Sequence, residues 1–267
     1  MPDDKDAAFG VTYAELDDRY LVPMLFAPYA SIVANRAAEL QPRTVLETAA
    51  GTGIVTRELS KSLPAASITA TDLNQPMIDQ AKSKSESANV VWHQADAMKL
   101  PFAGAGFDLV VCQFGVMFFP DKQAAFRETR RVLGPEGSLL FVVWDDWQQM
   151  PTAPLAIAAD AVADLVGCDP GALVNPPYHD EGRIRVDLNA AGFRHIDIDR
   201  LSQPATATSA RDGAVATVHG SLIRNVIETI APGRLAEATD AVERALRAKL
   251  GDGQIVGTTR ALIVLAN

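Results

Sequence analysis

Short apolar segments alternate with longer amphipathic segments from residue 43 to residue 144, and this alternation restricts the fold more than any other feature. Two of the apolar segments, 109–111 and 139–143, contain no polar residue, as is typical of strands buried on both faces. Strands that alternate with helices form a parallel sheet with helices on both faces and right-handed crossovers. We therefore predict an α/β fold. The predicted strands cover 44–47, 67–71, 90–93, 107–112 and 138–144, and the predicted helices run from the turn at Gly53 to about Leu63, onward from Pro76, and over 121–133.

The segments on either side of this alternation are less regular. Residues 13–41 favour a helix that is broken at Pro23 and Pro28, because proline lacks the N–H that a helix interior needs. After Asp145 we interpret the helices between the last two strands as a cap over the carboxyl edge of the sheet. The elements predicted here are helices at 153–166, 180–191, 211–230 and 234–250, a loop at 170–177, and strands at 195–201 and 259–265.

The composition restricts the partners of this 267-residue chain. Its formal net charge of −9 disfavours nucleic acid and anionic lipid, which both attract clustered Lys and Arg. The one basic cluster, Arg127, Arg130 and Arg131, we interpret as a solvated helix face. The longest apolar run, 139–144, is too short to span a bilayer, so we predict no integral membrane segment.

The N-terminus and the cysteines indicate the compartment. Residues 1–6 are acidic and polar, which is not the pattern of a signal peptide. The two cysteines, Cys112 and Cys168, lack the spacing of a metal site, so we predict no metal. We expect a cytoplasmic protein that is a monomer or a homodimer.

A glycine-containing loop follows the first strand of the alternating segment. Glu47 ends that strand, and Ala49, Gly51 and Gly53 lie in the turn before the next helix. Glycine lets the backbone approach a ligand that any Cβ would displace. Such a loop alone fits S-adenosylmethionine (SAM), NAD or a simple tight turn.

Acidic and polar residues follow the next three strands at corresponding points. Asp72 ends the second strand, where a carboxylate can accept hydrogen bonds from both ribose hydroxyls of a nucleoside. Asp96 follows the third strand and could accept from an adenine amino group, with Leu73, Ala97 and Met98 beside the ring. After the fourth strand, Gln113 and Phe114 could face the amino-acid end of a ligand. In an open parallel sheet these strand ends meet at one edge, so the residues predict a nucleoside site there.

These motifs give residues 45–145 a resemblance to class I SAM-dependent methyltransferases, in particular to the small-molecule group of ubiquinone and menaquinone biosynthesis. The resemblance implies a Rossmann-like, seven-stranded, mostly parallel sheet with a helical cap. It implies three segments: an N-terminal helical segment over the cofactor site (1–42), a SAM-binding core (43–146), and the remaining strands with a substrate cap (147–267). The matching motifs are 45–53, 71–77, 94–97 with 100–102, 107–111 and 131–137, and residues 20–29 resemble the helix that precedes the core in such enzymes.

The resemblance also implies roles for single residues. Ala49, Gly51 and Gly53 would line the methionine part of SAM, Asp72 would hold the ribose, and Gln113 would lie near the methyl path. The full set of residues that we predict to bind the cofactor is Tyr20, Glu47, Ala49, Gly51, Gly53, Asp72, Leu73, Met77, Asp96, Ala97, Met98, Gln113 and Phe114.

Two loops depart from the family pattern. Ala50 lies where a small residue or cysteine is common. Ala49 stands where the family has its first glycine, and its methyl group is tolerable if the φ angle is negative. Phe118 and Phe119 stand where many relatives carry a histidine, so a base is absent at that point.

No residue of the predicted core is an obvious catalytic base. Outside it, the weak candidates for this role are Tyr178, His179 and His219, and each could equally have a structural role. We interpret His93 as a core residue and Cys112 as a small apolar residue. The apolar residues Phe114, Met117, Phe118 and Phe119 could line a substrate site, although core packing is the commoner role for such a stripe.

Three functions are compatible with this pattern. The first is methyl transfer from SAM to a small-molecule acceptor, which would leave S-adenosylhomocysteine. The second is an NAD(P)-dependent oxidoreductase, but its fingerprint requires a third glycine at the position of Thr56. The third is a SAM-binding protein without catalysis.

Overall fold

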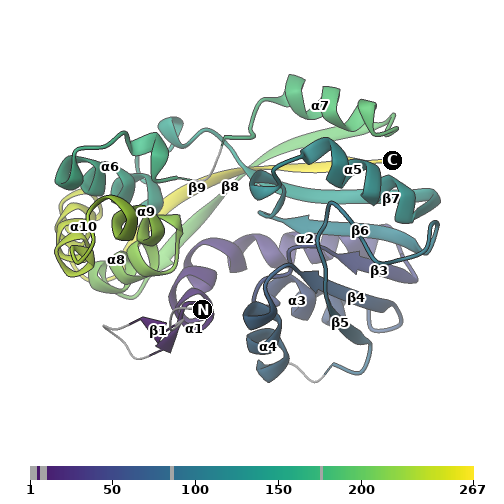
Figure 1. Cartoon of the computed structure of the whole chain (residues 1–267), viewed down its shortest axis with the longest axis horizontal. Coiled ribbons are helices and arrows are strands. Elements are labelled where there is room, and N and C mark those ends of the chain that lie inside the picture. The colour runs from purple at the N-terminus through teal and green to yellow at the C-terminus, as the bar shows by residue number, and fades with distance from the viewer. Residues whose placement is uncertain (1–4, 7–10, 85–86, 175–176) are drawn as a thin grey trace. The chain divides into compact units, whose positions relative to one another are not determined.

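A computed structural model describes residues 5–6, 11–84, 87–174 and 177–267 (Figure 1). Residues 1–4, the start of the predicted acidic N-terminus, and residues 175–176 of the predicted loop lie outside the described residues. Within the described part, the chain forms two compact units. The core unit contains 29–145, 177–201 and 261–267, and the helical unit contains the described residues of 1–28, 146–176 and 202–260. These boundaries differ from the three predicted segments. Each unit contains residues from before position 146 and residues from after it.

The sheet has seven strands in the order β5-β4-β3-β6-β7-β9-β8. Parallel pairs join β3 to β4 and β6, β4 to β5, and β6 to β7, whereas β9 pairs antiparallel with β7. This order confirms the predicted mostly parallel α/β fold. The strands are β3 (Thr44–Glu47), β4 (Ser67–Asp72), β5 (Val90–Gln94), β6 (Phe107–Gln113), β7 (Leu133–Trp144), β8 (Ile196–Ala207) and β9 (Ile255–Ala266), with β1 (Lys5–Asp6) and β2 (Val11–Thr12) in a separate small sheet.

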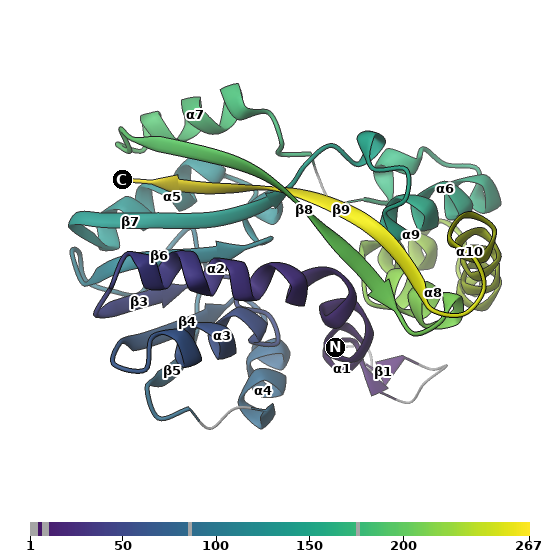
Figure 2. The same cartoon turned by 180° about the vertical axis from the view of Figure 1, so that it is seen from behind.

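Helices cover both faces of the core unit's part of the sheet. Helix α2 (Ala27–Glu39) lies in front of the sheet in Figure 2, and α5 (Lys122–Val132) lies in front of it in Figure 1. Helices therefore cover the central strands on both faces and exclude solvent from them. Every residue of 109–111 and 139–143 is at most 2% exposed. The other helices of this unit are α3 (Ile54–Ser62), α4 (Gln75–Lys84) and α7 (Glu181–Ala190).

Two predicted helix boundaries were wrong. The N-terminal helix continues through Pro23, because the turns of 17–26 widen to a π-helix in which the Ala27 N–H bonds to the Val22 carbonyl. This wider turn accommodates a residue that has no N–H. The segment predicted as one helix at 211–230 divides at Gly220 and Ser221. The Ser221 hydroxyl accepts from the Ile223 N–H and begins a new helix.

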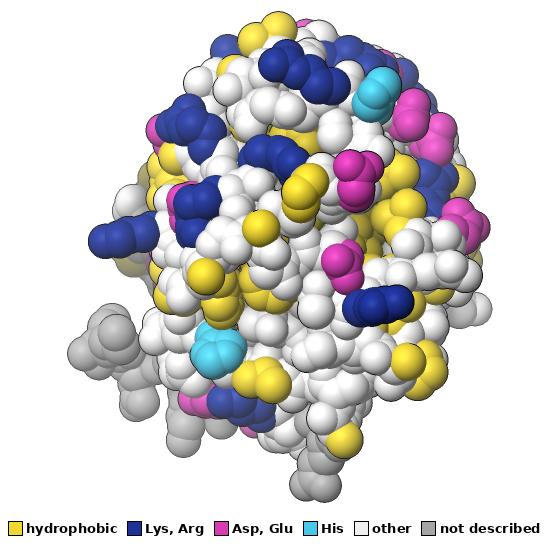
Figure 3. Space-filling view, turned by 90° about the vertical axis from the view of Figure 1, so that its right-hand side faces the viewer, with side chains coloured by type: hydrophobic (Ala, Val, Ile, Leu, Met, Phe, Trp, Pro, Cys, Tyr) yellow, Lys and Arg dark blue, Asp and Glu magenta, His cyan; other side chains and the backbone are white. Residues whose placement is uncertain are grey.

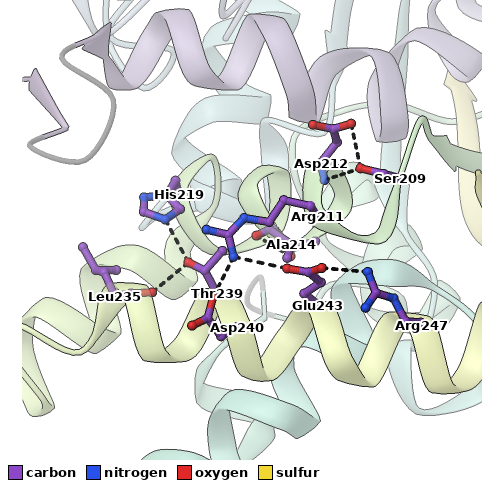
Figure 4. Close-up of polar contacts among 11 residues, drawn as sticks. Ser209, Arg211, Asp212, Ala214, His219, Leu235, Thr239, Asp240, Glu243 and Arg247 are labelled. Carbon is purple, nitrogen blue, oxygen red and sulfur yellow. Dashed lines mark hydrogen bonds and ion pairs between the residues drawn. The ribbon is translucent and has the colours of Figure 1, made fainter. Parts of the chain in front are cut away.

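The helical unit is built from four main helices and the first turns of the chain. They are α6 (Pro154–Val166), α8 (Ala210–His219), α9 (Leu222–Ile230) and α10 (Leu235–Leu250), with α1 (Tyr13–Leu16) and η1 (Asp17–Phe26) before them. Figure 4 shows how α8 and α10 pair through polar side chains. The Arg211 guanidinium lies 2.7 Å from the Asp240 carboxylate and 3.3 Å from that of Glu243. Along the described chain, no helix combines the length and apolar composition needed to cross a membrane.

The basic cluster of α5 is largely engaged within the core unit. Arg130 donates to the carbonyls of Gly134 and Pro135, and Arg131 donates to Glu128 and to the carbonyls of Leu100 and Phe102. On the face shown in Figure 3, basic side chains lie among acidic and apolar ones. Because Arg130 and Arg131 donate to backbone carbonyls of neighbouring segments, they do not form only a solvated helix face.

Candidate active site

The loop between β3 and α3 is held by hydrogen bonds to the strands on either side. The Thr48 N–H donates to the Val111 carbonyl of β6, and the Ala50 N–H donates to the Thr71 carbonyl of β4, both at 2.9 Å. Between these anchors Ala49 has a φ of +53°. The condition of a negative φ at Ala49 is therefore not met, because the two anchors fix the turn that a glycine would normally make. A left-handed alanine costs about 1–2 kcal/mol.

The Ala49 methyl group is accommodated by a glycine in the next loop. A Cβ at Gly115 would lie 2.5 Å from the Ala49 Cβ and 2.8 Å from the Cys112 Sγ. No side chain fits there, so Gly115 provides the space that Ala49 fills. From the sequence, residues 112–115 were expected to face the amino-acid end of a ligand, and the space that Gly115 leaves for Ala49 was not predicted.

Gly51 and Gly53 both have positive φ, but their surroundings differ. A Cβ at Gly51 (φ +56°) would meet nothing within 4 Å, so the backbone there borders open space. A Cβ at Gly53 (φ +81°) would lie 2.8 Å from Trp92 Cη2 of β5. Gly51 thus leaves room beside the loop, and Gly53 allows α3 to begin against the tryptophan.

Asp72 joins the glycine loop to the loop after β4. It is 8% exposed, and its Oδ2 accepts from the Gly51 N–H at 2.9 Å while its Oδ1 accepts from the Asn74 N–H at 2.8 Å. Burial raises the pKa of this carboxyl, and the backbone hydrogen bonds partly oppose that rise. Each oxygen retains acceptor capacity, since a carboxylate offers about four lone-pair sites.

The residues predicted around the adenine occupy the ends of β4 and β5. Leu73 is 62% exposed, and its carbonyl accepts from Gln94 Nε2 at 2.8 Å. Asp96 is half-buried, and its Oδ1 accepts from the Met98 N–H at 2.8 Å. Ala97, Met98 and Met77 are also half-buried. The structure therefore brings Leu73 and Gln94 together directly, and it orders the Asp96 turn through its own backbone.

His93 was expected in the core, but it is exposed, because β5 is the edge strand of the sheet. Its imidazole meets the Phe102 ring edge-to-face at 5.9 Å between ring centroids. The core interpretation of His93 was therefore wrong.

The end of β6 combines a polar residue with an aromatic cluster. Gln113 is half-buried, and Phe114 has a φ of +57°. The Phe114 ring stacks on Trp144 at 3.7 Å between centroids and meets Tyr29 edge-to-face at 5.3 Å. Phe114 is 5% exposed, so its main contacts are with the core. Of the other apolar residues in this stripe, Met117 is buried, Phe119 is half-buried and Phe118 is 46% exposed.

Glu47 is 1% exposed at the end of β3, and its Oε2 accepts from the Thr56 hydroxyl at 2.5 Å. Burial raises the pKa of Glu47 to about 8, and the nearby Asp72 carboxyl adds to the rise. The Thr56 hydrogen bond and the Arg57 guanidinium act in the opposite direction. Thr56 was not predicted as the partner of Glu47, although its place in the first turn of α3 follows from the predicted helix.

Of the three base candidates, Tyr178 has a structural role. Its hydroxyl donates to Asp187 Oδ2 at 3.0 Å, and Asp187 also accepts from Gln123 and Arg183. Burial and the Asp187 charge raise the Tyr178 pKa further above its usual range, so the phenol keeps its proton. This hydrogen bond disfavours Tyr178 as a base, and its candidate role stays a prediction.

The other two base candidates lie in different units. His219, in the helical unit, is 2% exposed and lies 3.0 Å from the Thr239 hydroxyl (Figure 4). Thr239 donates its one hydroxyl proton to the Leu235 carbonyl, so His219 Nε2 must be the donor in this pair. His179, in the core unit, is half-buried and stays a candidate. Tyr20 belongs to the helical unit, and its role at the cofactor stays a prediction. Among the described residues, no three His, Cys, Asp or Glu side chains are grouped so that they could hold a metal ion.

Comparison with known proteins shows what this loop and these strand ends resemble. Residues 45–137 match the family model described as a methyltransferase domain. This segment is similar to methyltransferase domains. The resemblance inferred from the sequence is thereby confirmed, and it covers β3 to the start of β7.

Two curated relatives match this part of the chain. Demethylmenaquinone methyltransferase of Deinococcus radiodurans is 35% identical over 111 residues, which cover 41% of this chain and 46% of that protein. The ubiquinone/menaquinone biosynthesis C-methyltransferase UbiE of Pseudomonas paraeruginosa is 41% identical over 101 residues, which cover 36% and 40%. The chain thus spans less than half the length of either relative.

A solved structure extends the likeness of the fold. The YcgJ protein of Bacillus subtilis superposes with a TM-score of 0.58 over 88% of this chain and 97% of that one, at 17% sequence identity. This similarity confirms the Rossmann-like fold beyond the matched domain.

Proposed function

We propose that this protein is a SAM-dependent methyltransferase that acts on a small-molecule acceptor. The observation that carries the proposal is the connection of Gly51 to Asp72 inside a methyltransferase domain. One carboxylate fixes the glycine loop and still has lone pairs for a ribose, the arrangement that a nucleoside at this sheet edge requires. The relatives with quinone-biosynthesis names support a small-molecule acceptor.

The residues of the loop fit the cofactor. The backbone at Gly51 borders open space, as an approaching methionine moiety requires. The Thr52 hydroxyl is buried, and no described residue forms a hydrogen bond with it, so it is available to a ligand. We assign Ala49, Gly51 and Gly53 to the methionine part, Asp72 to the ribose, and Asp96, Ala97 and Met98 to the adenine.

When bound, SAM supplies a methyl group that is already activated by the sulfonium, so the hard chemistry belongs to the cofactor. The protein must hold the acceptor in line and exclude water, and positioning of this kind can remove about 7–11 kcal/mol from a barrier. The rigid strand ends of β3, β4 and β6 provide the fixed side of that geometry. With Tyr178 hydrogen-bonded to Asp187, His179 is the remaining candidate base within the core unit.

The geometry disfavours an NAD(P)-dependent oxidoreductase. That fingerprint has a glycine where this chain has Thr56, and the Thr56 hydroxyl is committed to Glu47. A SAM-binding protein without catalysis is the second candidate, because no single catalytic residue defines the family. A cytoplasmic location and the choice between monomer and homodimer stay predictions.

Transfer of a labelled methyl group tests the proposal. The full chain, incubated with methyl-labelled SAM and a small-metabolite extract, is expected to produce a labelled small molecule together with S-adenosylhomocysteine. Asp72→Ala, which removes the carboxylate proposed to bind the ribose, is the matched negative control. Tight SAM binding without label transfer to any fraction would instead favour the non-catalytic candidate.

A further inference from the structure

Glu47 is a buried acid at the base of the proposed cofactor site. It ends the third strand of the seven-stranded sheet, two residues before the loop that begins at Ala49, and it is 1% exposed. Its Oε2 accepts the Thr56 hydroxyl at 2.5 Å. Among the described residues, no Lys, Arg or His nitrogen forms an ion pair with it within 4.0 Å. A carboxylate held in this way has little to offset its loss of water.

The ionisable groups around Glu47 come from three elements. Asp72 approaches from β4, Cys112 from β6 and Arg57 from α3. Asp72 disfavours a second negative charge, and the Cys112 thiol is neutral, since burial raises its pKa to about 11. Arg57 favours the charge, but it is the weakest influence, and its guanidinium donates to the Thr52 carbonyl at 2.7 Å. With no ligand bound, Glu47 therefore holds its proton at neutral pH.

The predicted cofactor would change this balance. SAM carries a fixed positive charge on its sulfonium and a second on its ammonium group. Its single carboxylate balances only one of them, so the net charge is +1. A cation placed within a few ångströms of a buried carboxyl lowers the pKa of that carboxyl by about 1–3 units. The loop proposed to hold the methionine part starts beside Glu47, so the arriving charge would act at short range.

We propose that Glu47 senses the charge of the cofactor, staying neutral while the site is empty and releasing its proton to solvent when SAM binds. This inference rests on the proposed function. The Glu47 O–H bond breaks, the carboxylate keeps the electron pair, and the proton leaves to the buffer. Thr56, which donates to Oε2, stabilises the charged form. S-adenosylhomocysteine lacks the sulfonium charge, so it induces a smaller release than SAM.

Two measurable consequences follow from this linkage. Between the pKa values of the bound and free states of Glu47, SAM affinity rises with pH by up to about tenfold per pH unit. Glu47→Gln copies the neutral acid in shape, and its amide oxygen can still accept from Thr56. This variant is therefore expected to fold, to bind SAM about 2- to 100-fold more weakly near neutral pH, and to lose this part of the pH dependence.

Calorimetric titration of the full-length protein with SAM counts the protons. At one pH near 7, buffers of different ionisation enthalpy give the number released from the slope of the observed heat. We expect about one proton for the wild type with SAM, fewer with S-adenosylhomocysteine, and close to none for Glu47→Gln. Asp108→Asn, at the start of β6, is the matched acidic control and should release as many protons as the wild type. The Glu47→Gln curve also subtracts the titration of the SAM amino group, which has a pKa near 8.

The outcomes distinguish the two claims. SAM binding without proton release, or equal release with SAM and S-adenosylhomocysteine, overturns the role of Glu47 and leaves the proposed function intact. An absence of SAM binding overturns the proposed function as well. If Glu47→Gln fails to fold, the wild-type comparison of the two ligands still decides the matter.

Discussion

The proposed cofactor edge of the core unit, which is the loop 48–53 together with Asp72, is stabilised by different means from the helical unit. At the cofactor edge, hydrogen bonds from backbone N–H groups stabilise the loop. Asp72 and the neighbouring strands accept these bonds and fix three positive φ angles. In the helical unit, side chains join whole helices, as in the pairing of His219 with Thr239 and of Arg211 with Asp240. The first arrangement suits a site that must hold one ligand shape. The second needs only stable packing, which many sequences can provide.

The family match follows the same division. Residues 45–137, the matched domain, belong entirely to the core unit. We therefore expect changes at the cofactor edge to alter SAM binding, and changes to the pairing of α8 with α10 in the helical unit to alter stability alone.

Asp72→Ala is expected to have the largest effect. It removes the acceptor of two backbone N–H groups and the proposed ribose ligand, so SAM affinity should fall by about 100-fold or more in calorimetric titration. Asp108→Ala is the control, because Asp108 also accepts two backbone N–H groups, from Arg43 and Thr44, but at the opposite end of β3. Asp72→Ala binding within threefold of wild type would refute the ribose assignment.

His219→Ala tests the helical unit. Removal of a buried ring and of the hydrogen bond to Thr239 should lower the free energy of unfolding by about 2–3 kcal/mol, measured by urea denaturation. SAM affinity should stay within twofold of wild type. A large loss of affinity in a folded His219→Ala protein would break the division between the two regions.

Gly53→Ala separates backbone strain from packing. The variant combines a φ of +81° with a Cβ placed 2.8 Å from Trp92, and Gly233→Ala provides the strain alone, at φ +85° with nothing within 4 Å. We expect Gly53→Ala to cost at least about 1 kcal/mol more than Gly233→Ala in thermal or urea unfolding. Equal costs would show that Trp92 moves away freely.

The pH dependence of stability tests Glu47 without ligand. Its pKa is raised from 4.5 in the unfolded chain to about 8 in the folded protein, so between these values the folded state holds one more proton. The stability contribution is full below the lower pKa and is lost as the pH rises through the upper one, by about 1 kcal/mol per pH unit. Glu47→Gln should remove this slope from denaturation curves recorded between about pH 5 and about pH 8. Parallel curves for the two proteins would contradict a neutral Glu47.

Ala49→Gly should have the smallest effect. Relief of a left-handed alanine is partly offset by the greater freedom of glycine in the unfolded chain, so stability should rise by less than about 1 kcal/mol. A loss of stability would mean that the Ala49 methyl group, which packs where Gly115 has no Cβ, contributes more than its backbone strain costs.

The sequence predicted the strand ends of this edge well because their determinants are local. The bounds of β3 were predicted to the residue, and Asp72 was placed at the end of β4, since strand ends and glycine turns depend on a few neighbouring positions. The features that were not predicted depend on residues that are distant in the sequence. The φ of Ala49 is set by Val111 and Thr71, and the exposure of His93 is set by the position of β5 at the edge of the sheet.

The helical unit was less predictable for the same reason. The separation of α8 from α9 depends on Gly220, where a Cβ would meet the Ala216 carbonyl at 2.7 Å and Leu21 at 3.2 Å. The pairing of Tyr178 with Asp187 was not predicted, because Asp187 is nine residues away on the next helix. Tyr178 was therefore considered as a base. Periodicity and composition do not contain such pairings.

The most direct test of the central claim is a calorimetric titration of the wild-type protein with SAM and, separately, with NADH. We predict one SAM site per chain, with binding in the range of roughly 1 µM to 1 mM that is typical of enzyme KM values, and no detectable heat with NADH. NADH binding without SAM binding would contradict the account, because the loop at Gly51 and Asp72 would then serve a different nucleotide.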